Sequence, residues 1–82
     1  MEELKDALKE KKVTIGTERT IKNLKMNRLK KVYISSNCKK EVKEDIEHYC
    51  KIYNIPLIAL KENNEELGIL CKKPFNISVL SI

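Results

Sequence analysis

Residues 31–60 read KVYISSNCKKEVKEDIEHYCKIYNIPLIAL, and this stretch decides the fold class. A short apolar run predicts a strand over residues 31–35. The next segment, residues 39–53, has apolar side chains at helical spacing, namely Val42, Ile46, Tyr49, Cys50 and Tyr53. Asn54 is predicted to end this helix, and Pro56 to precede a second strand over residues 57–60. The stretch alternates strand, helix and strand, which is typical of an α/β protein.

The residues before this stretch continue the alternation. Apolar side chains three and four apart predict a short amphipathic helix over residues 2–11. The β-branched residues 13–15 predict a brief strand that ends in a turn at Gly16. Thr17 is predicted to cap a second helix, which continues to about residue 26 and stops at Asn27.

The residues after the stretch complete the pattern. Residues 61–68 form a polar loop that runs into a short helix, Pro74 stops that helix, and residues 76–82 alternate as a last strand. The single domain, residues 1–82, is therefore predicted to be a three-layer α/β/α sandwich around a four-stranded mixed, mostly parallel sheet. Ligands of such sheets usually bind beyond one end of the strands. Residues 16–19, 36–39 and 61–66 are expected to share that end.

The charge of the chain is concentrated in GTERTIKNLKMNRLKK, residues 16–31. The net charge is +5, while residues 1–12, 39–51 and 61–73 each balance their cations and acids. One acid, Glu18, stands against six cations in the run: Arg19, Lys22, Lys25, Arg28, Lys30 and Lys31. Such a concentration is typical of an element that binds a polyanion, so we interpret it as part of a nucleic-acid-binding surface.

Gly16 and Thr17 open the basic helix. The N–H groups of a first helical turn have no partner within the helix, and the helix dipole favours an anion there, so a phosphate fits. An ordinary glycine turn is the alternative explanation of these two residues. The pattern G-x-x-x-x-G-K-[ST] is absent from the sequence, which argues against a nucleotide-binding P-loop.

Three asparagines follow the predicted strands, and their amides suit the recognition of unpaired bases. Asn37, Asn63 and Asn64 can both donate and accept hydrogen bonds. Asparagine is also common in turns, which is the alternative for each of them. Base stacking on the sheet is not expected, because the aromatic residues fall at inward-looking positions: Tyr33, Tyr49, Tyr53 and Phe75.

The titratable residues of the longest predicted helix do not form a catalytic pattern. Asp45 and His48 lie three apart with Glu44 and Glu47 beside them, but no nucleophile is paired with them and H-E-x-x-H is absent. We interpret these residues as ion pairs on a surface helix, and we do not expect an enzyme.

The cysteines and the N-terminus indicate the redox state, metal content and location that we expect. Cys38, Cys50 and Cys71 form no C-x-x-C pair and the chain has one His, so we expect reduced, mostly buried thiols, no metal and no cofactor. The N-terminus is charged throughout, and no apolar run approaches the ~20 residues that span a membrane. A cytoplasmic protein that is monomeric when free is expected.

Four ordered blocks of the chain resemble a known family. IGTERTIKNLK (residues 15–25) is similar to its glycine-led helix start, and KKVYISSNC (residues 30–38) to its strand ending in an Asn. EVKEDIEHYCKIYNIPLI (residues 41–58) resembles its next helix and strand, and NNEELGILCKKPFNISVLSI (residues 63–82) its E-L-G loop, short helix and final strand. The chain thus resembles the kink-turn-binding ribosomal protein superfamily, and within it the archaeal and eukaryotic L-thirty-e family of the large subunit.

The resemblance implies an RNA-binding structural component of the large ribosomal subunit that recognises a kink-turn, an RNA helix bent sharply at an internal loop. Family members grip this RNA with the helix start, the Asn after the second strand and the loop before E-L-G. Carried over by position, the implied contacts are Gly16, Thr17, Glu18, Arg19, Lys22, Asn37, Glu62, Asn63, Asn64 and Glu65. Arg28 and Lys31 of the basic run are expected to add phosphate contacts.

Glu18 departs from the family pattern, in which Lys or Asn is expected at this position. An acid cannot donate to a phosphate, although it could accept from a guanine amino group, or Arg19 could take over the contact. Two alternatives therefore stay open: a non-ribosomal kink-turn protein of a guide-RNA particle or regulatory leader, and a protein-interaction module that has lost RNA binding. The sequence also lacks the C-terminal tail of many relatives, which we interpret as a minimal member or a side branch.

Overall fold

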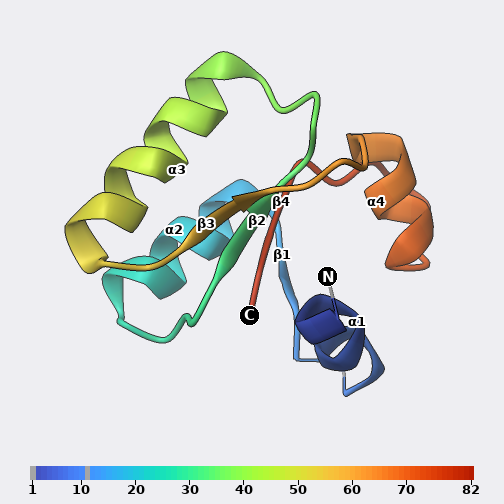
Figure 1. The fold of residues 1–82 in the computed structure, drawn as a ribbon, viewed down its shortest axis with the longest axis horizontal. Helices are drawn as coiled ribbons and strands as arrows, with labels where there is room; N and C mark the ends of the chain where they lie inside the picture. The colour runs from blue at the N-terminus through green and yellow to red at the C-terminus, as the bar shows by residue number, and fades with distance from the viewer. Residues whose placement is uncertain (1, 11) are drawn as a thin grey trace.

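The computed structural model describes residues 2–10 and 12–82 (Figure 1). In chain order it contains α1 (Glu2–Lys9), β1 (Thr14–Ile15), α2 (Thr17–Lys25), β2 (Val32–Ile34), α3 (Lys40–Tyr53), β3 (Leu57–Ala59), α4 (Asn64–Leu70) and β4 (Val79–Ser81). The predicted alternation of helix and strand is confirmed, with strands shorter than predicted. The predicted first helix included Lys11, which lies outside the described residues. None of the described helices has the length and apolar character that crossing a bilayer requires.

The four strands form one sheet in the order β1-β4-β2-β3. β2 and β3 are parallel, whereas β4 runs antiparallel to both of its neighbours, β1 and β2. The sheet is mixed, as predicted. However, only one of its three strand pairs is parallel, so the prediction of a mostly parallel sheet is wrong. The reason lies in residues 71–78, which bring the chain back to the edge where α4 began, as the 2.9 Å bond from the Ile77 N–H to the Asn64 carbonyl shows. β4 therefore starts at that edge and runs the other way.

Helices cover both faces of the sheet (Figure 1). Successive strand residues point to opposite faces, so each face has its own apolar set. The face under α2 and α3 contains a buried cluster with Leu24, Val32, Ile34, Ile46 and Val79. The face under α1 and α4 contains a second cluster with Leu4, Tyr33, Leu67, Ile77 and Leu80. Burial of each such aliphatic side chain contributes roughly 1.5–3 kcal/mol, and the two clusters hold the four helices on the sheet.

Two asparagines end helices as predicted. Asn27, just after α2, and Asn54, just after α3, adopt left-handed conformations with φ of 56° and 55°. Asparagine accepts this conformation more easily than most residues, because its short polar side chain can bond to nearby backbone groups. Both predicted stops are confirmed.

Two other predictions about helix ends are wrong. Thr17 is the first helical residue and not the cap; the N-cap is Gly16, and no side chain of the described residues caps α2. Pro74 does not stop α4, because the helix already ends at Leu70, and Lys72 turns the chain with a φ of 57°.

Candidate nucleic-acid interface

Three loops leave the sheet at the same edge. β1, β2 and β3 run in the same direction, since β4 is antiparallel to β1 and β2 and β3 is parallel to β2. The residues that follow these strands therefore meet, as predicted. We call this edge the rim and define it by residues 16–19, 36–39 and 61–66.

Backbone hydrogen bonds to the start of β4 set the spacing of the first two loops. The Gly16 N–H donates to the Val79 carbonyl and the Ser35 N–H to the Ser78 carbonyl, each at 2.9 Å. Neighbouring strands lie about 4.8 Å apart, so Gly16 and Ser35 are roughly 10 Å apart across β4. One RNA segment can reach both loops.

The start of α2 is open. Gly16 has a φ of 111° and a ψ of 155°, a conformation available almost only to glycine. The N–H groups of Thr17, Glu18 and Arg19 have no acceptor within the helix, and no described side chain caps them. Apart from its two chain neighbours, a Cβ at Gly16 would meet no described atom within 4 Å, so that side of the glycine is open. An anion at this place would face unpaired N–H groups and the positive end of the helix dipole.

Two cations stand beside this opening. Arg19 and Lys22 are exposed and lie three residues apart on α2, so they share one face of the helix. Within the described residues, neither forms an ion pair. Glu18 is exposed in the same turn. Lys25 is engaged differently, because its Nζ lies 5.2 Å from the centre of the Tyr49 ring and joins α2 to α3.

Asn37 and Asn64 join the second and third loops directly. The Asn37 Nδ2 donates to the Asn64 Oδ1 at 3.0 Å, and the Asn64 backbone N–H donates to the Asn37 Oδ1 at 2.9 Å. The Ser36 N–H also donates to the Glu62 carbonyl at 2.8 Å. The two loops thus form one unit, held by residues 27 positions apart.

The asparagine pair retains donors that can face a ligand. An asparagine amide has two N–H donors, and the pair uses one donor of Asn37 and none of Asn64. The other three N–H groups have no acceptor in the described part of the chain. They point to recognition of acceptor atoms, such as base carbonyls or phosphate oxygens.

Asn63 has a different role, which we did not predict. Its Oδ1 accepts from the Glu66 N–H at 2.8 Å, and the Glu66 carboxylate accepts from the Asn63 N–H at 3.1 Å. This capping box starts α4 at Asn64, so the second half of the predicted polar loop, residues 64–68, is helical. The spacing N-x-x-E was the sequence signal that could have identified it.

The two acids that the family resemblance assigned to this loop lie at its ends. Glu62 is half-buried and joins the second loop through its backbone carbonyl. Glu65 is exposed in the first turn of α4, where an acid stabilises the helix dipole. Their carboxylates would repel phosphates, so neither is suited to hold the RNA backbone.

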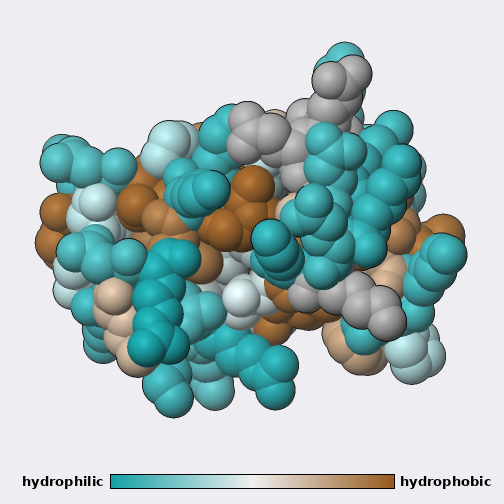
Figure 2. Space-filling view, turned by 90° about the horizontal axis from the view of Figure 1, so that it is seen from below, coloured by the Kyte–Doolittle hydropathy of each residue, from teal (hydrophilic) through white to brown (hydrophobic). Residues whose placement is uncertain are grey.

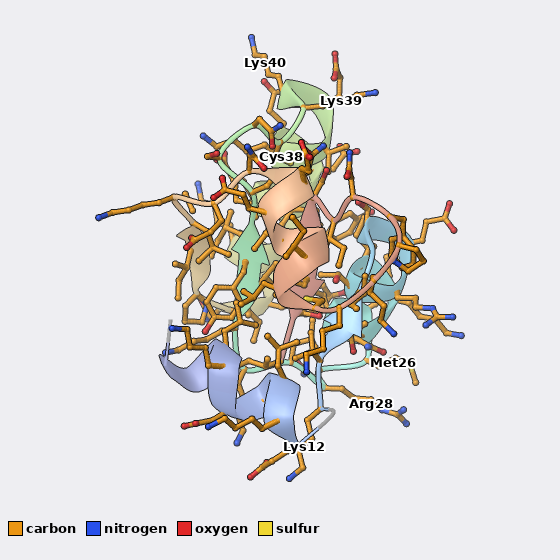
Figure 3. The ribbon with its side chains drawn as sticks, turned by 90° about the vertical axis from the view of Figure 1, so that its right-hand side faces the viewer. Lys12, Met26, Arg28, Cys38, Lys39 and Lys40 are labelled. Carbon is orange, nitrogen blue, oxygen red and sulfur yellow. The ribbon has the colours of Figure 1, made fainter. Side chains whose placement is uncertain are left out.

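Arg28 and Lys31 do not belong to the rim. α2 runs away from the rim for nine residues, roughly 13 Å, and Arg28 follows its far end. The Ile82 N–H donates to the Lys31 carbonyl at 3.0 Å, which places Lys31 beside the last residue after β4. Figure 3 shows Arg28, with Met26 and Lys12, at the end of the molecule opposite Cys38, Lys39 and Lys40. The basic run is therefore divided between the rim and the opposite end of the molecule.

Phe75 is an exposed aromatic residue near the rim. Its exposed fraction is 52%, so the prediction that it faces inward is wrong. Gly68 explains its position: a Cβ on this buried glycine of α4 would clash with the Phe75 carbonyl oxygen, so the segment lies directly on the helix. Ile77, two residues further on, bonds to Asn64. The backbone of Phe75 thus lies on α4, and its ring is exposed to solvent.

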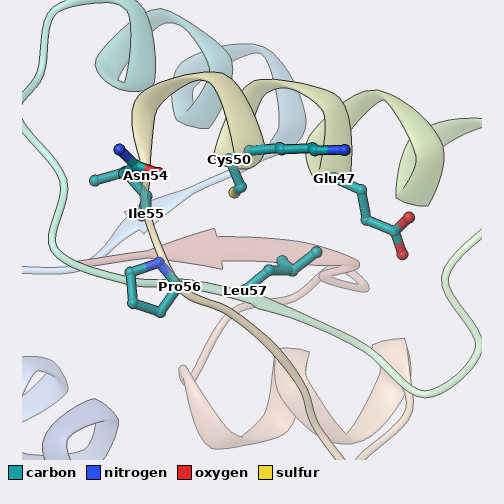
Figure 4. A pocket seen from close by; sticks show the side chains of 7 residues that line it. Glu47, Cys50, Asn54, Ile55, Pro56 and Leu57 are labelled. Carbon is teal, nitrogen blue, oxygen red and sulfur yellow. The ribbon is translucent and has the colours of Figure 1, made fainter.

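Another surface, on α3, has no such arrangement. Lys40 and Glu44 lie 3.9 Å apart and Lys43 and Glu47 4.0 Å apart, which confirms the predicted ion pairs for Glu44 and Glu47. A hollow of about 380 Å³ lies between the end of α3 and β3, and Figure 4 shows Glu47 pointing away from Cys50 there. Among the described residues, no group of three or more His, Cys, Asp or Glu side chains could hold a metal ion.

All three cysteines are free thiols. Cys50 is buried, and Cys38 and Cys71 are half-buried. Burial raises the pKa of each thiol, and the charges of Lys43 and Lys73 partly oppose this for Cys38 and Cys71 respectively. A raised pKa keeps the thiol protonated at neutral pH and lowers its reactivity as a nucleophile.

Comparison of the sequence with known proteins gives one family. A sequence model of the "Ribosomal protein L7Ae/L30e/S12e/Gadd45 family" matches residues 1–82. The chain is 45% identical to the "Large ribosomal subunit protein eL30" of Saccharolobus solfataricus over 80 residues, which cover 98% of this chain and 74% of that protein. It is 43% identical to the protein of the same name from Methanococcus vannielii, over 85% of this chain and 67% of that protein.

Two solved structures have the same fold at lower identity. One is described as a protein with unknown function from Bacillus halodurans C, with a TM-score of 0.85, 22% identity and coverage of 93% of this chain and 75% of that one. The other is the Giardia lamblia 15.5kD RNA binding protein, with a TM-score of 0.84, 18% identity and coverage of 95% of this chain and 65% of that one. At these identities the likeness is one of fold.

Proposed function

Since this chain belongs to the ribosomal protein L7Ae/L30e/S12e/Gadd45 family, we propose that it is an RNA-binding structural component of the large ribosomal subunit and that its rim recognises a kink-turn in ribosomal RNA. Relatives of 45% and 43% identity are large-subunit ribosomal proteins, which supports the ribosomal role. It would act in the cytoplasm as part of the ribosome and be monomeric before assembly.

The observation that carries the proposal is the meeting of an open helix start with the Asn37–Asn64 pair at one edge of the sheet. The N–H groups after Gly16, together with Arg19 and Lys22, bind phosphate oxygens. The free amide donors of the asparagine pair bind acceptors on base edges.

Phe75 supplies a stacking surface for a base that leaves the helix at the kink. The three-layer α/β/α scaffold holds these groups before RNA arrives. We therefore expect the RNA to do most of the bending.

Binding to a kink-turn RNA and to a plain duplex of the same length tests the specific claim. In a gel-shift titration we expect the kink-turn RNA to be bound at a protein concentration at which the duplex is still unbound. If roughly four to six phosphates are neutralised, affinity should fall a hundredfold or more between 50 and 200 mM salt. Equal binding to both RNAs would remove kink-turn recognition. Failure to bind either at micromolar protein would favour the alternative of a protein-interaction module, which exposed Glu18 supports.

A matched pair of double variants separates the rim from net charge. Arg19→Ala/Lys22→Ala and Arg28→Ala/Lys30→Ala each remove two exposed cations of the same basic run. We expect the first to weaken kink-turn binding by about tenfold or more and the second by less than about threefold at moderate salt. Equal losses would mean that the RNA responds to total charge and not to the rim.

Sedimentation of the tagged protein tests the ribosomal assignment separately. Co-sedimentation with free large subunits and with ribosomes is expected. A protein that binds kink-turns but sediments away from large subunits belongs to another ribonucleoprotein.

A further inference from the structure

A groove of about 760 Å³ lies between α1, β1 and the end of α4. Its floor is aliphatic and consists of Leu8, Val13, Ile15 and Leu70, with the thiol of Cys71 among them. Figure 2 looks onto the side of the molecule where α1 lies and shows hydrophobic surface between groups of hydrophilic side chains. A hollow of this size can hold several side chains of a bound segment.

Four lysines line the same groove. Lys5 and Lys9 stand one turn apart on α1, and Lys72 and Lys73 follow α4. In the described structure none of the four forms an ion pair. The two acidic side chains described on this part of the chain, Asp6 and Glu10, do not line the groove, and Glu10 pairs with Lys12 at 3.3 Å. Among the described side chains, an aliphatic floor thus lies inside a positive border.

Lys72 and Lys73 belong to the same end of the groove as Cys71. Lys73 and Cys71 both line the groove, and the charge of Lys73 opposes the rise that burial causes in the pKa of the Cys71 thiol. Lys72 has a φ of 57°, a conformation in which glycine or asparagine is favoured, and yet this position presents a lysine to the groove.

We propose that this groove binds an acidic segment of a partner protein whose aliphatic side chains enter the floor and whose carboxylates pair with Lys5, Lys9, Lys72 and Lys73. An amphipathic helix with leucines on one face and flanking glutamates has this chemistry. RNA fits less well, because bases stack on aromatic rings or on arginine, and neither lines the groove.

The groove and the rim adjoin at β1, where Ile15 of the groove directly precedes Gly16 of the rim. Along α4 they are further apart, since the helix runs from Asn64 at the rim to Leu70 at the groove, a length of roughly 10 Å. The inference does not depend on RNA binding, and a ribosomal component with both sites would join RNA to a neighbouring protein.

A synthetic peptide provides the probe. It has about 14 residues, with leucine at helical spacing, glutamate at most other positions and a fluorescent label. We expect binding that weakens as salt increases, and much weaker binding of two control peptides. One control has lysine in place of glutamate, and the other has serine in place of leucine. Equal binding of either control would overturn the proposal.

Lysine variants test where the peptide binds. Lys5→Ala/Lys9→Ala and Lys72→Ala/Lys73→Ala should each weaken binding by about three- to tenfold. Lys43→Ala/Lys51→Ala removes the same charge from exposed positions of α3, across the sheet, and should leave binding unchanged. Equal effects of all three variants would mean that only net charge matters and would overturn the proposal.

The cysteines report occupancy of each site independently. The peptide should slow alkylation of Cys71 severalfold and leave Cys38 unchanged, because only Cys71 lines the groove. Kink-turn RNA should do the reverse, because Cys38 lies in the second rim loop. Failure of the peptide to protect Cys71 would overturn the groove proposal, whatever the RNA does. Protection of Cys71 by a plain RNA duplex in place of the peptide would make the groove a nucleic-acid surface and would also overturn it.

Discussion

α2 and α4 both start at the rim, but they differ in the hydrogen bonding of their first-turn N–H groups. α2 starts after Gly16, and no described side chain caps it. α4 starts after Asn63, whose side chain and that of Glu66 each accept from the other's backbone N–H. The first-turn N–H groups of α2 are therefore available to a ligand, whereas α4 has a capping box of its own.

We therefore expect the start of α2 to contact RNA and the start of α4 to hold the rim loops in place. Only an unfilled start can bind an anion, because a capping side chain already occupies the donors. The filled start of α4 holds Asn37 through Asn64, and further along the helix Gly68 lies directly on the segment with Phe75. Changes in the capping box and in the packing of α4 should thus act first on stability, and changes at the start of α2 or in the Asn37–Asn64 pair on RNA binding.

Gly68→Ala should have the largest effect. The added methyl group would clash with the Phe75 carbonyl oxygen and would lie about 3.2 Å from the carbonyl carbon, so helix or segment must move. We expect a loss of about 2 kcal/mol in the free energy of unfolding, even though alanine favours helix by about 1 kcal/mol. Urea unfolding measures this loss.

Gly16→Ala is the matched comparison for that variant. Its methyl group has room, so any loss comes from the positive φ alone. A Gly68→Ala protein as stable as the parent would contradict the close packing of α4 on this segment.

Asn37→Ala and Asn64→Ala should each weaken kink-turn binding by about tenfold, since each breaks the amide pair that presents donors at the rim. The double variant should be little weaker than either single one, because both substitutions remove the same hydrogen bonds. Anisotropy titrations of all four proteins measure this coupling. Additive losses would mean that the two residues bind RNA separately.

Asn63→Ala should lower the free energy of unfolding by about 1 kcal/mol, because α4 loses its cap. RNA affinity should change by less than about threefold, since the Asn63 oxygen is used inside the protein. Thermal unfolding and RNA titration on the same sample separate the two effects. A large loss of affinity with unchanged stability would mean that Asn63 contacts the RNA directly.

Glu18→Gln should have the smallest effects, with opposite signs. Removing a carboxylate from the first turn of α2 should lower stability by roughly 0.3–0.5 kcal/mol, because the helix dipole favours an acid there. The same change removes repulsion of phosphates and should raise kink-turn affinity about two- to fivefold. Weaker RNA binding would instead indicate that the Glu18 carboxylate accepts from a guanine amino group.

Local patterns predicted most of the elements but not their directions. α3 was predictable because its apolar side chains repeat over 14 residues, and Asn54 ends it through its own conformational preference. The direction of β4 was not, because it depends on residues 71–78 returning to the edge where α4 begins. Phe75 was misplaced for a related reason, since its exposure follows from close packing on Gly68.

The sequence by itself determined the alternation of helix and strand, the excess of positive charge in residues 16–31 and the glycine at the start of α2. Backbone preferences and side-chain periodicity act over a few residues, so these features can be read locally. Only the tertiary structure decided that Asn37 meets Asn64 and that the basic run divides, with Arg19 and Lys22 at the rim and Arg28 and Lys31 at the opposite edge. Those positions follow from packing helices on both faces of one sheet, which brings distant residues together and carries neighbours in the chain apart.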